Sequence, residues 1–319
     1  MGMVMCSLGI LTNGGTLVYP CEGFKANMAL KAVEHYKCNS ATGVPTMYFS
    51  MLKEYKDNGA NYDISSLHKA AIAGSLCPAE LMKGCKDVLG IDPMLNAYGM
   101  TETSPLSTQC RADSSFLKKT TTVGKVFPHV EVKIADEKGL VIPRGEPGEI
   151  CVRGYLVMLK YWNDPEKTKE TIDENNWVRT GDIGIIDEEG YVEIVGRVRD
   201  MIIRGGENIS PKEVENHIIT HDGIFDVQVV GVHDETRGEE VMACIILENA
   251  DELVTREDIF EFLHGKIAYF KIPRYVRILT EFPLTVTGKV MKTVLRDDAN
   301  KVLEEVEPGV WEVDHGIYV

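Results

Sequence analysis

Positive charge is scarce in this chain, because 34 Lys and Arg residues face 49 Asp and Glu residues, for a formal net charge of −15. This balance opposes broad docking on nucleic acid or on an anionic membrane surface, since both are themselves negatively charged. The 319 residues are 44% hydrophobic and 26% charged, which excludes disordered and collagen-like classes and allows two or three folded domains. A small-molecule function is therefore favoured, with no nucleic-acid partner.

Cysteine pairs at ligand spacing are also missing. The eight cysteines stand at positions 6, 21, 38, 77, 85, 110, 151 and 244, and no two of them form a Cys-x-x-Cys pair. A dense disulfide framework and a cysteine-based zinc site are therefore both disfavoured. A reducing, intracellular compartment fits this pattern best.

No charged side chain precedes Glu22. The opening MGMVMCSLGIL resembles a signal peptide only superficially, because no basic segment comes first and no small-residue cleavage site follows. It is also too short and too rich in nearby glycine to span a bilayer. We expect a core helix here, then a Gly-Gly turn and a strand at 16–19, with no membrane span and no transit peptide.

Helical and strand patterns alternate through the first 119 residues. Apolar residues at helical spacing predict helices at 24–37, 45–55 and 78–89, and short apolar runs predict strands at 41–44 and 70–73. Alternation of this kind predicts a parallel sheet covered by helices.

The period changes to two between residues 120 and 198. Alternating residues predict strands at 130–134, 149–153 and 191–195, with glycine-containing turns at 136–139 and 187–190. We expect an antiparallel, barrel-like unit in this segment.

The pattern of the sequence changes again at residue 199. A capping box at Ser210 predicts a helix that buries Val214, His217 and Ile218. Two β-prone runs at 226–232 and 241–247, a helix capped by Thr255 and a strand at 275–279 complete a small α+β domain. The predicted organisation is α/β: a large domain over 1–198 (sheet portion 1–119, β-rich unit 120–198), a small domain over 199–300 and an acidic tail over 301–319.

Four polar clusters fall in predicted loops, where chemistry usually lies. They are YGMTET at 98–103, RTGD at 179–182, GRVRD at 196–200 with GGEN at 205–208, and PLTVTGK at 283–289. Each alone is more often a helix cap or a solvated turn than a ligand site. In this order, they resemble the acyl-CoA synthetase branch of the adenylate-forming, or AMP-binding, superfamily over about residues 2–296. Residues 200–209 and 270–273 are most similar to its mitochondrial medium-chain members.

The resemblance implies part of an adenylate-forming large domain, followed by a small mobile C-terminal domain. It also implies a two-step ligase reaction. A fatty-acid carboxylate attacks the α-phosphorus of ATP to give an acyl-adenylate and pyrophosphate, and the thiol of CoA then displaces AMP. Both reactants of the first step are anions, so this step needs positive charge where negative charge concentrates. The implied ligands are ATP or AMP, Mg²⁺, CoA and a medium-chain fatty acid. The acyl chain length and a mitochondrial matrix location follow from the resemblance alone.

The resemblance assigns roles around the phosphate and the adenine. Thr101 would hold the AMP phosphate, and Glu102 would coordinate Mg²⁺, a hard cation suited to carboxylate and phosphate oxygens. Tyr98, followed by Gly99, would lie against the adenine, although a half-buried core tyrosine explains the same pattern. The other adenine face would meet Gly74 and Ser75, where small or absent side chains let the backbone come close.

Asp182 resembles the ribose ligand of the family, since one carboxylate can accept hydrogen bonds from two vicinal hydroxyls. Arg197 would donate to the same sugar. Taken without the resemblance, Asp182 is more simply a turn residue.

Lys289 resembles the catalytic lysine of the family's small domain, which reaches into the large domain and bridges the carboxylate and the α-phosphate. Its flexible stem and compact ammonium suit that reach. Arg199 occupies the hinge position, where Asp or Lys is commoner. Gly205 and Gly206 would line the pantetheine tunnel, although a Gly-Gly turn between a strand and the helix at Ser210 explains them equally well.

One family motif is missing, namely the Ser/Thr/Gly-rich loop ending in Pro-Lys that wraps the β- and γ-phosphates. Residues 1–97 contain only TNGGT at 12–16, which lacks the lysine. The resemblance begins inside the large domain, so roughly the first half of that family is absent from the sequence. We therefore expect poor adenylation by this chain alone, and exposed sheet edges and apolar surface.

Two alternatives stay open. The chain is a partial ligase or a non-catalytic remnant that binds nucleotide or a protein partner without turnover. An adenylation domain that loads a carrier protein shares every motif, but it normally adjoins a carrier module, and none follows Val319.

Overall fold

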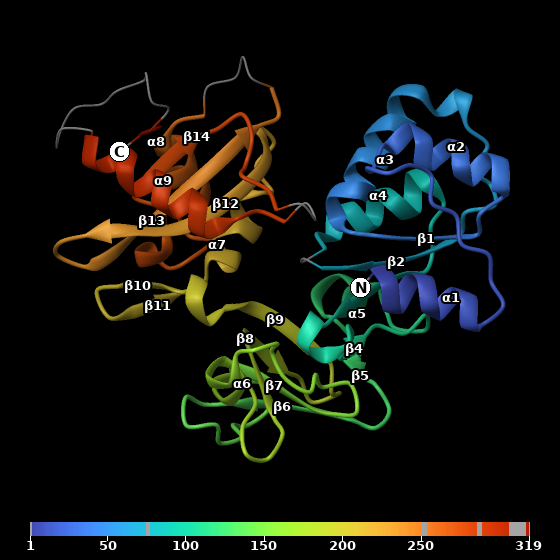
Figure 1. Ribbon diagram of the computed structural model, residues 1–319. Helices are drawn as coiled ribbons and strands as arrows, with labels where there is room; N and C mark the ends of the chain where they lie inside the picture. The colour runs from blue at the N-terminus through green and yellow to red at the C-terminus, as the bar shows by residue number, and fades with distance from the viewer. Residues whose placement is uncertain (1, 75–76, 250–253, 286–288, 306–316, 319) are drawn as a thin grey trace. The chain divides into compact units, whose positions relative to one another are not determined.

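The computed structural model of the chain describes residues 2–74, 77–249, 254–285, 289–305 and 317–318 (Figure 1). Internal contacts divide the chain into two compact units, Met1–Ile194 and Val195–Val319. The division lies close to the boundary that we predict after residue 198.

A mixed five-stranded sheet organises the first part of unit 1. In spatial order its strands are β1 (Ser40–Gly43), β2 (Lys69–Ala73), β3 (Met94–Tyr98), β4 (Thr108–Gln109) and β5 (Lys125–Val126). The first three are parallel to one another, whereas β4 and β5 add antiparallel pairs. The prediction of a parallel sheet with helices is therefore confirmed for β1–β3, and the short antiparallel strands were not predicted.

Three amphipathic helices pack together and cover this sheet (Figure 1): α2 (Ala26–Tyr36), α3 (Pro45–Asn58) and α4 (Ala79–Leu89). Pro45 begins α3 at a position where its missing N–H costs nothing, and Gly90 ends α4 in a left-handed conformation with φ 70°. Leu30, Tyr48 and Leu81 are almost fully buried in the shared core. The short helices η2 (Gly59–Asn61) and α5 (Phe116–Thr121) lie in the connections.

The N-terminal expectation was wrong. The segment forms a π-helical stretch, η1 (Gly2–Leu8), that runs into α1 (Gly9–Thr12), and none of residues 2–12 is buried. Residues 16–19 are not a strand; this run stops at Pro20, which cannot donate to a ladder. Apolar surface is exposed here as predicted, since Met3 and Tyr19 are 71% and 72% exposed.

The second sheet of unit 1 has four antiparallel strands in sequence order: β6 (Val130–Ala135), β7 (Gly148–Gly154), β8 (Val178–Ile186) and β9 (Val192–Arg197). The predicted turn glycines Gly139 and Gly190 have φ of 80° and 85°. The order of strands begins at β6 and ends at β9, so the β-rich unit is an open sheet over the described residues rather than a closed barrel. The helix α6 (Pro165–Thr171) interrupts the chain between β7 and β8.

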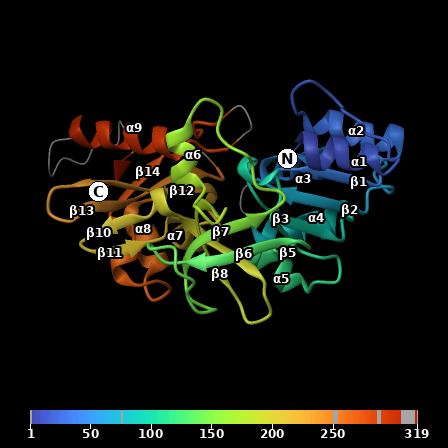
Figure 2. The same cartoon turned by 60° about the horizontal axis from the view of Figure 1, so that its bottom comes forward.

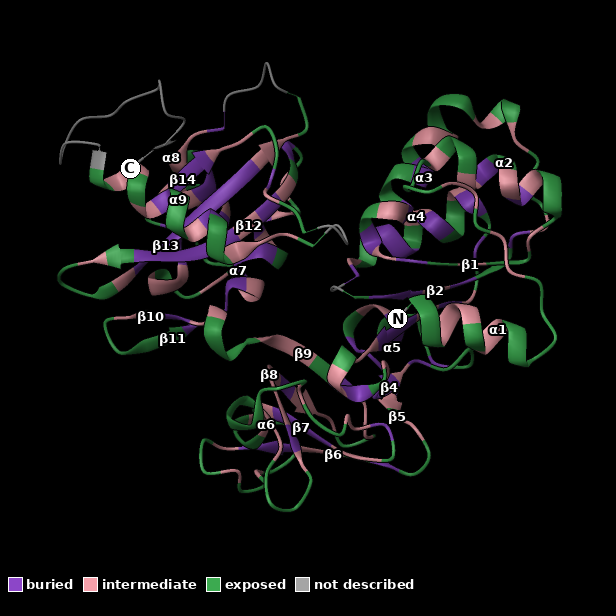
Figure 3. Cartoon of the chain, in the orientation of Figure 1, coloured by how far each residue is buried: buried purple, intermediate pink, exposed green. Residues whose placement is uncertain are grey.

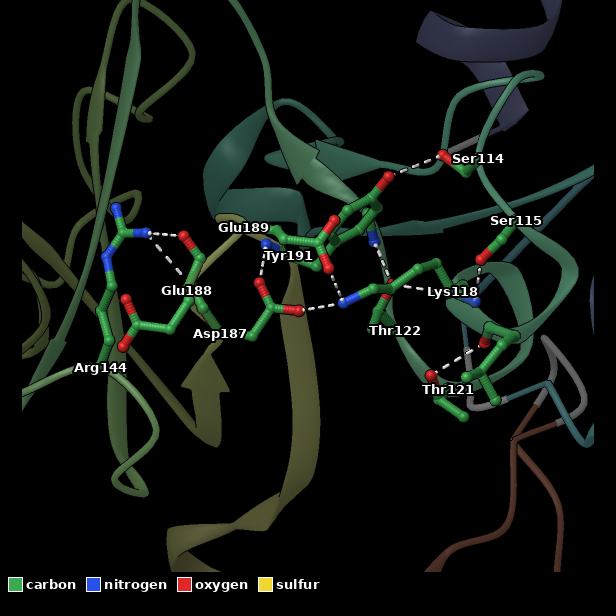
Figure 4. A network of polar contacts seen from close by, with 12 residues as sticks. Ser114, Ser115, Lys118, Thr121, Thr122, Arg144, Asp187, Glu188, Glu189 and Tyr191 are labelled. Atoms are coloured by element: carbon green, nitrogen blue, oxygen red, sulfur yellow. Dashed lines mark hydrogen bonds and ion pairs between the residues drawn. The ribbon is translucent and has the colours of Figure 1, made fainter.

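A polar network links α5 to the turn between β8 and β9 (Figure 4). The Lys118 ammonium lies 2.5 Å from Asp187 Oδ2 and 3.0 Å from Glu189 Oε1. The Tyr191 ring makes cation–π contacts with Lys118 and Lys125, whose Nζ atoms lie 4.7 and 4.4 Å from the ring centroid. Burial is the largest single effect and acts to raise the pKa of Asp187, but the Lys118 ammonium and the backbone N–H groups of Tyr191 and Glu189 together outweigh it, and the pKa lies below its ordinary value. The network fixes the two sheets of unit 1 to each other.

Unit 2 is built on a second mixed sheet. Its main path is β11 (Glu207–Ile209), β10 (Ile202–Arg204), β13 (Gly238–Leu247), β14 (Tyr275–Ile278) and β15 (Ile317–Tyr318), and β12 (Ile224–Asp234) pairs with β13. Its helices are η4 (Val198–Asp200), α7 (Pro211–Ile218), α8 (Arg256–Leu263), η5 (Tyr269–Lys271) and α9 (Lys292–Glu305). This confirms the predicted α+β domain.

The strands β12 and β13 are buried on both faces (Figure 3). Val229 and Ala243 point into a core shared with α7 and α8, whereas Val230 and Cys244 point into a core shared with α9. Helix α9 therefore covers the opposite face of the sheet from α7 and α8 (Figure 2). At the start of the segment predicted as a helix end and tail, α9 continues to Glu305 as expected, whereas β15, which pairs with β14, was not predicted.

The two predicted helix caps of unit 2 had different outcomes. Thr255 and Asp258 form a reciprocal capping box, as predicted for α8. Ser210 makes no side-chain cap for α7, because its hydroxyl instead donates to the Val195 carbonyl oxygen over 2.6 Å. His217 is only half-buried, unlike its predicted partners Val214 and Ile218.

Candidate nucleotide-binding site

The candidate site begins at one edge of the mixed sheet. Strands β2 and β3 are parallel neighbours with Ala73 opposite Ala97, so Gly74 and Tyr98 leave the sheet side by side at the carboxyl ends. This is where ligands bind in open α/β sheets. Gly74 has φ 97°, which explains a glycine at this point. Ser75, its predicted companion, lies outside the described residues.

Tyr98 and Asp182 meet at this edge although 84 positions separate them. The Tyr98 hydroxyl donates to Asp182 Oδ2 over 2.7 Å, and both residues are half-buried. The contact joins the predicted adenine residue to the predicted ribose residue. A carboxylate here keeps further lone pairs for hydroxyl donors.

Glu149 on β7 holds the segment that presents Asp182. Its carboxylate accepts from Arg179 Nε over 2.8 Å and from the Gly181 backbone N–H over 3.0 Å. The hydrogen bond from Arg179 to Glu149 raises the pKa of this arginine. The Asp182 N–H donates to Thr180 Oγ1, and Gly181 has φ 71°. Sequence reasoning missed Glu149, because it lies 30 residues from Arg179 and belongs to no motif.

Position 99 has no room for a side chain, so only glycine fits there. A β-carbon built on it would lie 2.1 Å from the Pro105 carbonyl oxygen, a distance that no side chain can accept. The chain then enters η3 (Thr101–Thr103), where Thr103 is buried and its Oγ1 accepts from the Met100 N–H over 3.1 Å. The same turn leaves Thr101 exposed and Glu102 half-buried.

Tyr161 holds the Glu102 side chain. Its hydroxyl donates to Glu102 Oε1 over 2.7 Å, and the Met158 N–H donates to the Glu102 carbonyl oxygen over 2.8 Å. Burial, and then the carboxylate of Glu102, raise the pKa of Tyr161, so the phenol stays a donor. Sequence reasoning missed this contact; the only local signal was the Asp-Pro helix start at Asp164, which places a loop just before it.

Replacing Tyr161 by phenylalanine is expected to reduce the free energy of unfolding of unit 1 by about 1–2 kcal/mol, because a partly exposed hydrogen bond to a carboxylate is lost. Urea denaturation, monitored by the circular dichroism of the backbone, measures this free energy of unfolding. The matched control is Tyr155→Phe in the same loop, where the side chain is 77% exposed. An equal effect of the two substitutions would remove the role given to the contact with Glu102.

The other predicted residues lie in unit 2. Arg197 ends β9 and is exposed; Arg199 lies in η4 with its side chain 72% exposed and its Nε 3.6 Å from Asp200 Oδ1. Gly205 and Gly206 form the two-residue turn of the β10–β11 hairpin, with φ of 59° and 90°. Both φ values are positive, as a type I′ turn requires, so the glycines connect two strands rather than a strand and a helix.

Lys289 is exposed on a short hairpin. Leu284 and Val290 form an isolated antiparallel bridge, and the Thr285 N–H donates to the Lys289 carbonyl oxygen over 2.8 Å. In return, the Lys289 N–H donates to Thr285 Oγ1 over 3.0 Å. Residues 286–288 of the predicted motif lie outside the described residues.

An arginine-rich cavity of about 320 Å³ lies wholly within unit 2. It is lined by Arg204, Arg237, Glu240, Arg256, Phe260, Tyr269, Ile272, Pro273 and Arg274. Four guanidinium groups against one carboxylate make it strongly cationic. No sequence motif indicated this cavity, because its arginines come from four separate segments of the chain.

Two family models match the chain. The model of the AMP-binding enzyme matches residues 1–162, and the model of the AMP-binding enzyme C-terminal domain matches residues 213–289. The chain belongs to the AMP-binding enzyme family. The resemblance inferred from the four motifs is thereby confirmed at the level of the family.

This AMP-binding chain is similar to curated acyl-CoA ligases. It is 44% identical over 291 residues to the mitochondrial medium-chain acyl-CoA ligase ACSF2 of Danio rerio, covering 91% of the chain and 48% of that protein. It is 43% identical over 296 residues to the putative acyl-CoA synthetase YngI of Bacillus subtilis (strain 168), covering 92% and 53%. The chain spans about half the length of the curated relatives it matches.

Solved structures of adenylate-forming enzymes share the fold. ATP-bound MatB from Rhodopseudomonas palustris matches with a TM-score of 0.86 and 30% identity, over 94% of this chain and 58% of that one. The anthranilate CoA ligase AuaEII in complex with anthranoyl-AMP matches with a TM-score of 0.80 and 29% identity, over 92% and 55%. These matches confirm the predicted fold class. Within the described part of the AMP-binding chain, no helix is both long and apolar enough to cross a bilayer.

Proposed function

We propose that this chain supplies the AMP-handling and CoA-handling part of an AMP-forming acyl-CoA ligase that acts on a medium-chain fatty acid. In the first step, a carboxylate oxygen bonds to the α-phosphorus of ATP and pyrophosphate leaves. In the second, the CoA sulfur bonds to the acyl carbon, AMP leaves with the bridging oxygen, and the thiol proton passes to solvent. The vertebrate relative named above, a mitochondrial protein, supports extending the proposal to a mitochondrial location, which the bacterial relative does not require.

The observation that supports this proposal most directly is the contact between Tyr98 and Asp182 at the carboxyl edge of β2 and β3. It gathers an aromatic ring, a carboxylate and the close-approach glycine Gly74 within one unit. We assign the ring to adenine, the carboxylate to the ribose hydroxyls and the exposed Thr101 to the phosphate. Arg197 is assigned as a second ribose donor.

Glu102 fits a role toward Mg²⁺. The described residues contain no group of three or more His, Cys, Asp or Glu side chains able to hold a metal. Mg²⁺ commonly takes one or two carboxylates and completes its shell with substrate phosphates and water, so a single oriented carboxylate suffices. When bound, the ion neutralises phosphate charge. The Tyr161 hydroxyl orients the Glu102 carboxylate by donating to Oε1, and this hydrogen bond does not occupy Oε2.

The arginine-rich cavity of unit 2 supports the CoA step. The nucleotide end of CoA carries three phosphates, and guanidinium groups pair with phosphate oxygens through two parallel hydrogen bonds. Tyr269, which is 71% exposed, and Phe260 add aromatic surface for a base. Gly205 and Gly206 directly follow Arg204, which is the last residue of β10 and lines the cavity. We assign these glycines to the pantetheine arm.

Titration calorimetry with AMP and with octanoyl-AMP tests the nucleotide site. Asp182→Asn is expected to weaken both affinities about 10- to 100-fold, because charge-assisted hydrogen bonds to the ribose are lost. Glu188→Gln, an exposed carboxylate in the β8–β9 turn, serves as the matched control and should leave both affinities unchanged. Absence of binding by the folded wild-type chain would remove the proposal.

A second candidate function is nucleotide binding without turnover, in which the contact between Tyr98 and Asp182 serves binding alone. Thioester formation from octanoyl-AMP and CoA separates the two candidates. Binding together with thioester formation supports the partial ligase, whereas binding without any thioester supports the remnant.

A further inference from the structure

A buried ion pair joins three elements of unit 2 beside the Lys289 hairpin. Glu215 of α7 is 6% exposed, and its Oε1 lies 2.5 Å from Lys292 Nζ. The same oxygen accepts from the Val229 N–H of β12 over 2.9 Å, and Lys292 Nζ donates to the Val229 carbonyl oxygen over 3.2 Å. Both charges therefore bond to the backbone of one residue, Val229, which lies midway along β12.

Neither charge is placed where its own helix would favour it. Lys292 is the first residue of α9, whose N-terminus carries partial positive charge and disfavours a cation. Glu215 lies in the second half of α7, toward the end that disfavours an anion. Burying a charge is also unfavourable unless it is paired and hydrogen-bonded. The pair therefore needs an explanation other than helix stability.

Lys292 follows Lys289 by three positions, so it holds the downstream end of the Lys289 hairpin. The upstream end is held by Phe282, which is 7% exposed and packed in the core beneath α9. Between these anchors, the Met291 N–H donates to the Pro283 carbonyl oxygen over 2.8 Å. The upstream end of the hairpin is thus fixed by apolar burial, and the downstream end by the ion pair together with Val290, which packs against the same core.

We propose that Glu215 and Lys292 are positioning residues for adenylation: the pair fixes the first turn of α9 on β12 and so holds the Lys289 hairpin in the conformation that the first half-reaction uses. The inference rests on the proposed function and on the adenylation role that the family resemblance implies for Lys289. A flexible hairpin would spread the Lys289 ammonium over many positions, and a misplaced catalytic group loses rate steeply. Thioester formation, which does not use Lys289, does not need the pair.

The test uses the full chain with both charges removed together. The double variant Glu215→Met/Lys292→Met removes both charges of the pair together, because one buried charge left alone would destabilise the unit by itself. Lys212, whose Nζ lies 3.8 Å from Glu215 Oε2, is 28% exposed along its side chain and remains in contact with solvent. Lys292→Arg keeps the pair. The control Glu213→Met/Lys271→Met removes an ion pair of the same helix α7, in which Lys271 Nζ lies 2.7 and 2.8 Å from the two Glu213 oxygens.

Hydrogen exchange at the Lys289 and Thr285 amides is the primary readout, because it does not depend on activity. The double variant is expected to speed exchange at these two amides about 10-fold or more, while the amides of β13 and those of β12 other than Val229, which loses its Glu215 acceptor, keep their protection. Lys292→Arg and the control pair should leave the hairpin as in the wild type. Unchanged hairpin exchange, or an equal loss across unit 2, would overturn the proposal.

The second readout is the ratio of the two half-reactions, measured as octanoate-dependent ATP–pyrophosphate exchange and as thioester formation from octanoyl-AMP. The double variant should lower the first relative to the second by about 10-fold or more. An equal fall in both would also overturn the proposal. A wild-type chain without either half-reaction would refute the proposed function, whereas the exchange result would still decide whether the pair holds the hairpin.

Discussion

Replacing Lys289 by alanine is expected to lower adenylation about 10²- to 10³-fold and to leave thioester formation from octanoyl-AMP within about twofold of the wild type. The physical reason is local. Two anions react in the first step, and the Lys289 ammonium would offset the charge that develops on the α-phosphate. In the second step, a thiol replaces AMP, and that charge is already formed.

Two assays on one protein preparation measure this effect: octanoate-dependent ATP–pyrophosphate exchange for the first step, and thioester release from synthetic octanoyl-AMP and CoA for the second. We expect slow exchange by the wild-type chain, since the phosphate loop of the family is not in this sequence. Lys301→Ala, which removes an exposed lysine of α9, is the control. Equal losses in both assays would refute the assigned role of Lys289.

The elements of the candidate site were more predictable than its contacts. The parallel strands β1 and β2 follow from short apolar runs and their helical neighbours. β3 was not predicted as a strand, and it ends at the same edge as β2 because the two are parallel neighbours. Tyr98 and Asp182 were each singled out by a motif, but the 2.7 Å contact between them depends on how the second sheet packs on the first. No local pattern contains that information.

The residues that sequence reasoning missed share a physical cause. Glu149 and Tyr161 act on motif residues 30 and 59 positions away, through hydrogen bonds that only the folded chain creates. Ser210 shows the converse: its local pattern is that of a cap, yet its hydroxyl donates to Val195. Tertiary partners compete with local ones for the same side chain, and the sequence pattern describes only the local ones.

The arginine-rich cavity had no sequence signal, and the placement of its arginines depends on one buried carboxylate. Glu240 is fully buried, and Arg204 Nε lies 2.5 Å from its Oε2. Arg237 and Arg274 approach its Oε1 at 3.3 and 3.7 Å. Three cations thus converge on one anion, and Arg204 is itself only 11% exposed along its side chain.

Replacing Glu240 by alanine is therefore expected to destabilise unit 2 by about 3–5 kcal/mol, because it leaves a buried guanidinium without its counter-charge. Thermal unfolding should show a fall in Tm of about 10 °C or more. The surviving folded fraction should bind CoA more weakly, since the arginines lose the carboxylate that aligns them.

Differential scanning calorimetry and CoA titration on the same samples separate the two consequences of losing Glu240. Glu235→Gln, an exposed carboxylate of the neighbouring turn, should change neither Tm nor CoA affinity. Arg204→Met with Glu240→Met removes the tightest pair together, so most of the lost stability should return while CoA affinity stays low. If that double variant recovered CoA binding as well, phosphate recognition would not lie in this cavity, and Glu240 would be a purely structural residue.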